Sequence, residues 1–346
     1  MFVPVVDQNN NPLMPTSSWR AGRWIKSEKA TGFWKKGVFC VRLNQEPSDR
    51  KTQEIVVGID PGSKREAYTV KSASHTYLNV LSETVDWVKD SLQSRREMRR
   101  ARRFRNIRYR EARFNNRKTK KLPPSTKARW QLKLRICSWL KQLFPICYFV
   151  VEDIKAKTTG KKKWDKSFSP LEVGKQWFYS ELRKLGILDT KAGYETKELR
   201  DNLGLKKSKK KLDDKFECHN VDSWVLANWK IGGHVIPDNK GIIKIIPLQF
   251  HRRQLHVFQF SKGGIRREYG GTRSLGLKRG SLVKHKKLGF CLVGGTSKGR
   301  ISLHNIETGK RITQNSKIED CRFRTYLSWR QEQSFPLTAK AVSLHD

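Results

Sequence analysis

The chain has 346 residues, and its 73 Lys and Arg against 32 Asp and Glu give a formal net charge of +41. Self-repulsion at this charge destabilises an isolated compact protein, so the composition favours a polyanion as partner over a small acidic substrate. Hydrophobic residues make up 36% of the chain, including 11 Trp and 16 Phe, which excludes global disorder and suffices for roughly two or three compact units.

No apolar run approaches the about 20 residues that a transmembrane helix needs, and residues 1–10 lack a secretory signal. The basic residues form no single amphipathic face, and no lipidation motif is present, so we expect no membrane partner. None of the six cysteines belongs to a C-x-x-C pair. We interpret them as buried thiols in a reducing compartment rather than as zinc or redox ligands.

The N-terminal region contains two strand-like runs, Phe2–Asp7 and Val38–Leu43, around a middle rich in Trp and Lys. Trp19, Trp24 and Trp34 alternate with Arg and Lys there. These rings fit two interpretations, namely stacking on nucleic-acid bases or the small core of this unit.

After a polar linker at residues 46–53, the β-branched run at residues 54–60 ends in Asp60, followed by Pro-Gly. This pattern predicts a buried strand that enters a tight turn. Further strands are expected near Ala67–Val70 and Thr76–Val80.

From Ser91 the chain has no Gly or Pro until Pro123, which predicts one long helix. Residues 95–135 contain 18 Lys and Arg but only two acids. A helix that is polar nearly all round does not belong to a core, and without acids for i, i+4 pairing it repels itself. We therefore expect this helix to contact phosphates.

The next segments alternate between helices, a strand and loops. The patterns predict a helix at about 126–143, a strand at 146–153 buried on both faces, helices at 170–185, 196–203 and 216–231, and a small all-β domain over 241–346. The Lys runs at 161–163 and 206–211 fit mobile loops with nonspecific phosphate contacts, or specific ones.

Three acids occupy positions that favour metal chemistry. Asp60 and Glu152 end buried strands, and Asp222 lies in a helix together with His219, three residues earlier and on the same face. Acids at the ends of adjacent strands meet at one sheet edge, where three carboxylates can hold two Mg²⁺ ions for phosphodiester hydrolysis. A nearby His can shuttle protons.

Each residue also has an ordinary explanation. An Asp before Pro-Gly is commonly a turn residue, a strand-end Glu is commonly solvated, and a helical His and Asp are commonly surface groups. We favour the metal site because the residues occur together in a very basic chain. The neighbouring acids Asp153, Asp213 and Asp214 are not favoured as ligands.

The acids lie in three short motifs, GIDPGS (58–63), YFVVED (148–153) and ECHNVDSW (217–224). These motifs resemble the three RuvC motifs of RNA-guided nucleases with a RuvC-like RNase H fold. PLMP (12–15) and RREMRRARR (95–103) are similar to signatures of the transposon-encoded IscB and IsrB proteins. GGTRSLGLKRGSLVKH and GKRITQNSKIEDC resemble their C-terminal domain. After GIDPGSK, the chain departs from relatives with Arg65-Glu66-Ala67 in place of small residues and Gly.

IscB proteins carry an HNH nuclease between the second and third RuvC motifs, and such a site needs histidines. Residues 153–218 contain no histidine, so the resemblance is to the IsrB family, which lacks HNH. It implies a complex with a guide (omega) RNA and a double-stranded DNA target next to a short flanking motif. It also implies nicking of the displaced non-target strand by the RuvC site. We expect one protein monomer per RNA, in the prokaryotic cytoplasm and at the nucleoid when on target.

The expected fold class is α/β, a RuvC-like RNase H fold split by an Arg-rich bridge helix, with a small N-terminal PLMP unit and a C-terminal small all-β domain. The expected boundaries are 1–50 for the PLMP domain, 51–85 for RuvC-I, 86–122 for the bridge helix, 123–168 for RuvC-II, 169–212 for a helical and Lys-rich linker in place of HNH, 213–248 for RuvC-III and 249–346 for the C-terminal β domain.

The resemblance gives the acids and histidine their roles. Asp60, Glu152 and Asp222 are expected to be catalytic and to bind Mg²⁺, with two ions and Mn²⁺ as a substitute, and His219 to be catalytic. The residues expected to bind RNA or the heteroduplex are Arg95, Arg96, Arg99, Arg100, Arg102, Arg103, Arg105, Arg108, Arg110 and Arg113.

Two alternatives remain open: an RNA-guided DNA-binding protein without cleavage, and a RuvC-type structure-specific (junction) nuclease without a guide.

Overall fold

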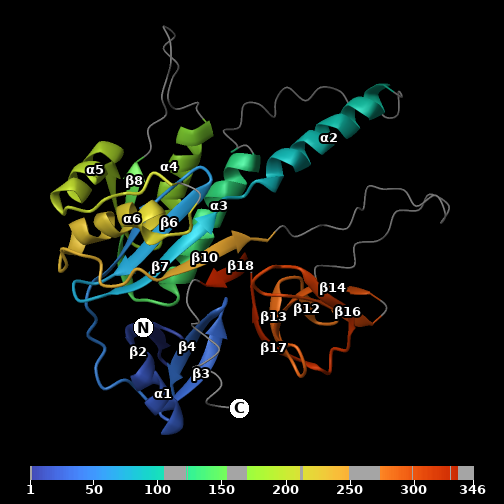
Figure 1. Cartoon of the computed structure of the whole chain (residues 1–346), viewed down its shortest axis with the longest axis horizontal. Helices are drawn as coiled ribbons and strands as arrows, with labels where there is room; N and C mark the ends of the chain where they lie inside the picture. Colours follow the sequence, from blue (N-terminus) through green and yellow to red (C-terminus); the bar gives the residue numbers. More distant parts are fainter. Residues whose placement is uncertain are drawn as a thin grey trace. The chain divides into compact units, whose positions relative to one another are not determined.

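A computed structural model describes residues 2–104, 122, 124–153, 170–210, 213–248, 273–297, 299–327 and 329–333. The chain forms two compact units, one made of Met1–Arg50 with Ile242–Asp346 and the other of Lys51–Gly241. Helices and sheets both occur (Figure 1), which confirms the predicted mixed α/β class. Among the described residues, no helix is both long and apolar enough to cross a membrane.

The unit 51–241 is built on a sheet whose strands run in the order β7-β6-β5-β8-β9. The strands are β5 (Ile55–Asp60), β6 (Arg65–Lys71), β7 (Thr76–Glu83), β8 (Ile146–Asp153) and β9 (Ile187–Ala192). β5, β6 and β7 form an antiparallel meander, whereas β8 runs parallel to β5 and β9 parallel to β8. The parallel part places the carboxyl ends of β5 and β8 side by side.

Helices cover both faces of this sheet (Figure 1). They are α3 (Pro124–Lys141), α4 (Pro170–Arg183), α5 (Gly193–Asn202) and α6 (Phe216–Ile231). A further helix, α2 (Trp87–Phe104), extends away from the sheet, and its residues 87–101 are half-buried or exposed. Side chains alternate between the two faces of the sheet along β6, so their contacts show which helix lies on which face. Thr69 Oγ1 lies 2.8 Å from Ser223 Oγ of α6, whereas Glu66 pairs with Lys133 of α3. α6 and α3 therefore pack on opposite faces.

Each face of β6 carries a buried charged group with partners. The fully buried Glu66 carboxylate pairs with the Lys133 ammonium and accepts a 2.8 Å hydrogen bond from the Tyr68 hydroxyl. Burial raises the pKa of Glu66, and Lys133 opposes that rise. On the α6 face, Lys71 Nζ donates to Asn228 Oδ1 at 2.8 Å and to the Gly232 carbonyl at 2.6 Å. Lys71 thereby holds the C-terminal end of α6 on the sheet.

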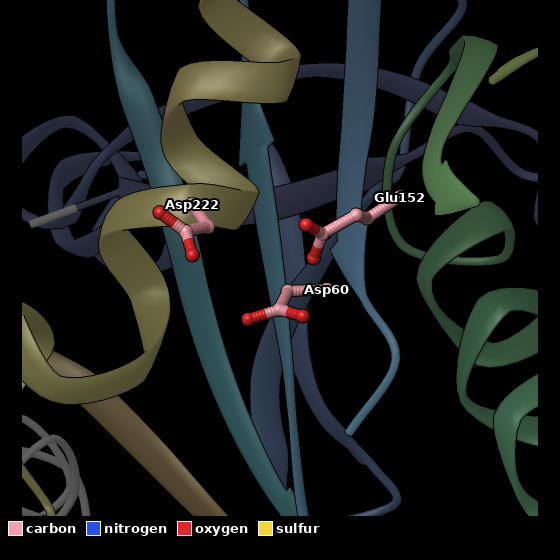
Figure 2. Close-up of side chains that lie close together, drawn as sticks. All are labelled: Asp60, Glu152 and Asp222. Carbon is pink, nitrogen blue, oxygen red and sulfur yellow. The ribbon is translucent and has the colours of Figure 1, made fainter. Parts of the chain in front are cut away.

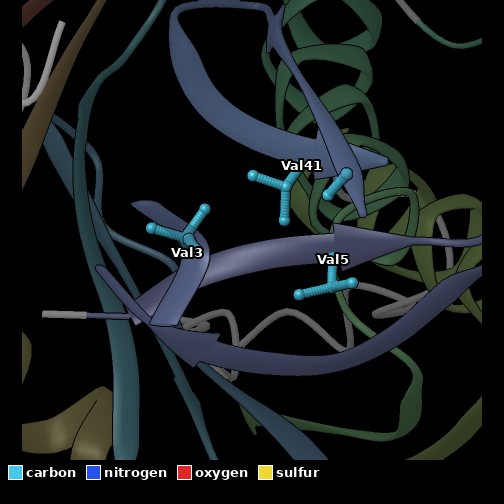
Figure 3. Close-up of a cluster of buried hydrophobic side chains, with 5 residues drawn as sticks. Val3, Val5 and Val41 are labelled. Atoms are coloured by element: carbon cyan, nitrogen blue, oxygen red, sulfur yellow. The ribbon is translucent and has the colours of Figure 1, made fainter. Parts of the chain in front are cut away.

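The N-terminal sheet has the order β2-β1-β4-β3. Its elements are β1 (Phe2–Val6), β2 (Pro12–Ser17), β3 (Ala30–Lys35), β4 (Val38–Leu43) and helix α1 (Ser18–Lys26). A small apolar core joins α1 to the sheet, and it consists of Val3, Val5, Ala21, Ala30 and Val41. Figure 3 shows the three valines of this core on their strands. The Ser17 hydroxyl caps α1 by accepting from the Arg20 N–H, so the PLMP residues lie in a strand that leads directly into a helix.

The three N-terminal tryptophans have different surroundings. Trp24 packs against the small core, and the Trp34 ring lies 5.7 Å from that of Phe39. Trp19 is 69% exposed, with the Arg23 guanidinium 4.7 Å from its ring centre. The core interpretation applies to Trp24, Trp34 packs against Phe39 at the border of that core, and the exposed Trp19 is available for stacking.

The C-terminal region forms a five-stranded antiparallel sheet in the order β16-β15-β14-β13-β17. Its strands are β13 (Ser281–His285), β14 (Gly289–Ser297), β15 (Arg300–His304), β16 (Arg311–Ser316) and β17 (Cys321–Tyr326). Two further pairings are β11 (Arg273–Ser274) with β12 (Leu277–Lys278) and β10 (Ile242–Pro247) with β18 (Trp329–Gln333). Val283, Cys291 and Val293 contribute to a buried core of this sheet, and Cys291 and Val293 lie two residues apart on the same face of β14.

Some elements differ from the sequence-based expectations. α2 begins at Trp87, before the expected Ser91, and its described part ends at Phe104. The rest of the expected long helix and the Lys-rich segment 155–169 lie outside the described residues. The strand β9 was not expected, because its residues are mostly half-buried or exposed and show no apolar run. α5 begins at Gly193 rather than Thr196, and the Glu195 carboxylate stabilises this start by accepting from the Ala192 N–H at 2.7 Å.

Candidate active site

Two neighbouring parallel strands direct acids to the same face of the sheet. Gly58 pairs with Val150 and Ile59 with Val151 across β5 and β8. Asp60 and Glu152 each follow by one residue. Side chains alternate along a strand, so both carboxylates point to the face that α6 covers. The two acids therefore lie side by side at the ends of adjacent strands, as the sequence pattern predicted.

The third acid comes from α6. Asp222 lies in the middle of this helix and is nearly fully buried. Carboxylate oxygens of Asp60, Glu152 and Asp222 all lie within 4.8 Å of one another (Figure 2). The structure thus brings together three residues that are far apart in the sequence.

The two aspartates affect the titration of Glu152. The pKa of Glu152 is raised to about 8, first by burial and then by the negative charges of Asp60 and Asp222. A group of oxygen donors with excess negative charge in a half-buried site suits a hard divalent cation such as Mg²⁺. The donor set is compatible with the expected metal.

Within the described part of the chain, two basic side chains contact this acidic group, and sequence reasoning did not single out either one. Arg200 of α5 donates from Nη1 to Asp222 Oδ1 at 2.6 Å. Lys207 Nζ lies 2.5 Å from Asp222 Oδ2 and 3.5 Å from Asp60 Oδ2. The only sequence signal was the Lys run at 206–211, which does not distinguish one lysine from its neighbours.

His219 lies one turn before Asp222 on α6, as the spacing predicted. Among the described residues, however, the group whose ligand atoms lie within 4.8 Å of one another consists of the three carboxylates, and His219 does not belong to it. Its Nε2 lies 3.5 Å from Arg65 Nη1. Burial, Arg65 and Lys207 together lower the pKa of His219, so the imidazole is mainly neutral near pH 7.

Arg65 begins the segment Arg65-Glu66-Ala67, which follows GIDPGSK where relatives have small residues and Gly. β6 pairs regularly with β5, with Ala67 opposite Asp60, so the strand geometry is intact. Arg65 pairs with the Asp214 carboxylate and donates to the Asp213 carbonyl at 3.0 Å. It therefore attaches the segment before α6 to the edge of the acidic site.

Asp153 faces the other side of the sheet from Glu152. It accepts from Lys175 Nζ at 2.8 Å and from the Tyr179 hydroxyl at 3.0 Å, both on α4. Strand alternation thus separates two adjacent acids: Glu152 belongs to the acidic group, and Asp153 fixes α4.

The arginines expected to bind RNA are described in part. Arg95, Arg96, Arg99 and Arg100 lie on α2 and are exposed. Arg102 and Arg103 also belong to α2. Arg105, Arg108, Arg110 and Arg113 lie outside the described residues.

Comparison with known proteins gives one family match. The sequence model of the family described as "RRXRR protein" matches residues 3–163, somewhat less than half of the chain. No curated protein matches. The solved structures that match include RuvC of T. thermophilus in complex with a Holliday junction substrate, which is 12% identical. That match covers 52% of this chain and 98% of the RuvC chain, with a TM-score of 0.29.

Proposed function

We propose that the protein is a RuvC-type endonuclease that hydrolyses DNA phosphodiester bonds with divalent metal ions. The observation that carries the proposal is the convergence of Asp60, Glu152 and Asp222 from β5, β8 and α6 in a chain of net charge +41. The charge indicates a polyanionic substrate, and the three carboxylates provide the ligands for metal-assisted hydrolysis.

Asp60, Glu152 and Asp222 are the residues that would hold Mg²⁺, with two ions expected and Mn²⁺ as a substitute. Bound there, the metal would stabilise the charge that develops on the phosphate and on the attacking and leaving oxygens. Arg200 holds one oxygen of Asp222 and thereby orients this carboxylate. His219, mainly neutral near pH 7, is proposed to accept a proton at the border of the site.

We further propose that a guide RNA directs this activity, as the resemblance to IsrB implies. The family match at residues 3–163 and the exposed arginines of α2 support this proposal, and residues 99–103 of that helix read R-R-A-R-R. Guanidinium groups suit phosphate contacts. In this proposal α2 is the start of a bridge helix, and the displaced non-target strand is nicked beside a short flanking motif. The boundaries expected from the sequence, including the PLMP and C-terminal domains, belong to the same proposal.

The activity is tested with the full chain purified together with its RNA and a matched DNA duplex. Mg²⁺ should support nicking of one strand, and both EDTA and Asp60→Ala should reduce nicking to background. The matched control is Glu217→Gln, because Glu217 lies on the same helix as Asp222 but is 44% exposed and pairs with Lys240. Nicking that survives Asp60→Ala would contradict the assignment.

The nature of the partner is tested separately by sequencing the nucleic acid that copurifies with the protein. A discrete, protected RNA supports guidance. Binding of matched DNA with no metal-dependent nicking would favour a binding protein that does not cleave. Cleavage of junction DNA by protein that carries no discrete RNA would favour a structure-specific nuclease.

A further inference from the structure

Lys207 occupies an unusual place for a lysine in a basic run. Its ammonium spans two acids of the site, at 2.5 Å from Asp222 Oδ2 and 3.5 Å from Asp60 Oδ2. Its side chain is 35% exposed, whereas the Asp222 side chain is only 5% exposed. The lysine therefore reaches from a loop into the acidic group and neutralises part of its charge.

Backbone hydrogen bonds on both sides fix the loop that carries Lys207. The Leu205 N–H donates to the Arg200 carbonyl at 3.1 Å, and the Ser208 N–H donates to the Glu217 carbonyl at 2.8 Å. Gly204 has a φ of 65°, which lets the chain turn sharply after α5. Lys207 is thus positioned by its backbone, and the run 206–210 is not simply a mobile charged loop.

The two cations at Asp222 have different contacts. Arg200 takes Asp222 Oδ1 from one side. Lys207 takes the other oxygen, Oδ2, and also approaches Asp60. It therefore lies between two carboxylates that converge from a strand and a helix. A divalent ion held jointly by Asp60 and Asp222 would compete with Lys207 for carboxylate oxygens.

We propose that Lys207 is a displaceable counter-ion of the acidic site, which holds Asp60 and Asp222 together before metal binds and leaves their oxygens when metal binds. This inference rests on the proposed function, because it presumes that these carboxylates are metal ligands. The physical reason is charge: carboxylates this close repel one another unless a cation separates them. Lys207 should therefore stabilise the metal-free protein and weaken its affinity for metal.

The test measures metal binding and metal-free stability instead of nicking. Mn²⁺ binding is followed by electron paramagnetic resonance, and melting is recorded in EDTA, for the full-length wild type and for Lys207→Met. The variant should bind Mn²⁺ on the order of tenfold more tightly, since a charge-assisted contact no longer competes. It should also melt at a lower temperature in EDTA, and Mn²⁺ should raise its melting temperature by more than it raises that of the wild type.

Two further variants serve as comparisons. Lys206→Met removes an exposed lysine next to Lys207 and should leave the Mn²⁺ dissociation constant unchanged. Lys207→Arg keeps the positive charge and should bind Mn²⁺ within about twofold of the wild type. Equal tightening in Lys207→Arg and Lys207→Met would overturn the proposal, because the effect would then come from the loop and not from the charge.

The outcomes also separate this inference from the proposed function. Suppose that the wild type binds Mn²⁺ and that Asp60→Asn abolishes this binding. If Lys207→Met then binds Mn²⁺ no more tightly than the wild type does, the counter-ion role is overturned and the metal site stands. If the wild type shows no Mn²⁺ binding, or if Asp60→Asn leaves its Mn²⁺ binding unchanged, the proposed function itself is overturned, and the counter-ion role with it.

Discussion

The backbones of Gly58 and Ser223 approach so closely that a β carbon on Gly58 would lie 1.8 Å from the Ser223 carbonyl oxygen. The same β carbon would lie 2.9 Å from the Ala227 nitrogen. Both obstacles are backbone atoms of α6, which cannot swing aside as a flexible side chain can. Glycine at this position lets α6 lie directly on β5, and this close packing brings Asp222 within reach of Asp60.

Gly58→Ala should therefore displace α6 and damage the acidic site. We expect a loss of at least about 2–3 kcal/mol in the free energy of unfolding, since overpacking against backbone leaves no cheap relaxation. Urea unfolding measures this loss, and Mn²⁺ binding to the folded fraction should weaken as well.

Gly22→Ala is the control for Gly58→Ala, because a β carbon on Gly22 in α1 meets nothing within 4 Å. Alanine in a helix should be neutral or stabilising by up to about 1 kcal/mol. Equal stability of the two variants would refute the close packing of α6 on β5.

Glu152 and Asp153 provide an adjacent pair with opposite expectations. Glu152→Gln should remove metal binding, because Glu152 belongs to the three-carboxylate group. Asp153→Asn should retain metal binding and lower stability by about 1–3 kcal/mol, because it weakens the contacts to Lys175 and Tyr179. Mn²⁺ titration and urea unfolding of both variants measure the two effects. If Asp153→Asn lost metal binding and Glu152→Gln kept it, Asp153 and not Glu152 would belong to the site.

Lys71 should make stability depend on pH. Burial lowers its pKa from 10.5 to about 8. Between these values the unfolded chain keeps a proton that the folded protein has released, so the free energy of unfolding rises with pH. The slope from this group is at most about 1.4 kcal/mol per pH unit.

Lys71→Met removes this contribution. The wild type should gain stability relative to the variant between about pH 8 and about pH 10, as measured by urea unfolding at several pH values. A constant difference between the two proteins across this range would show that Lys71 titrates normally.

The α2 arginines should determine how salt affects RNA binding. Replacing the exposed Arg95, Arg96, Arg99 and Arg100 by Gln should weaken RNA binding and make it less sensitive to salt. The log–log slope should decrease in magnitude by up to about 0.7–0.9 for each phosphate that the variant no longer neutralises. Replacing the same four residues by Lys keeps the charge and should keep the slope. An unchanged slope in the Gln variant would show that these arginines do not contact RNA.

The elements that carry the acids were predictable from sequence for a physical reason. β5 and β8 are buried on both faces, so they appear as apolar runs, and Asp60 and Glu152 stand out where these runs end. The helix α6 was delimited by Gly232 at its end, which has a positive φ of 67°. The adjacency of β5 and β8 then brings the two acids together.

Other features depend on contacts that no local pattern encodes. Lys207 has the same kind of sequence neighbours as Lys206 and Lys209, namely other lysines and a serine. Only the packing of its loop places it beside Asp222. The role of Arg65 depends on where the Asp213 carbonyl lies in space. The strand β2 was missed because its PLMP residues are mostly half-buried and include two prolines, which disfavour strands.

The spacing of the three acids along the chain has a consequence during protein synthesis. Asp222 follows Asp60 by 162 positions, and at about 5–20 residues per second a ribosome needs roughly 10–30 s to cover them. During that interval β5 and β8 can form, but α6 has not yet been made. A nascent chain therefore carries its cationic helix before its acidic site is complete.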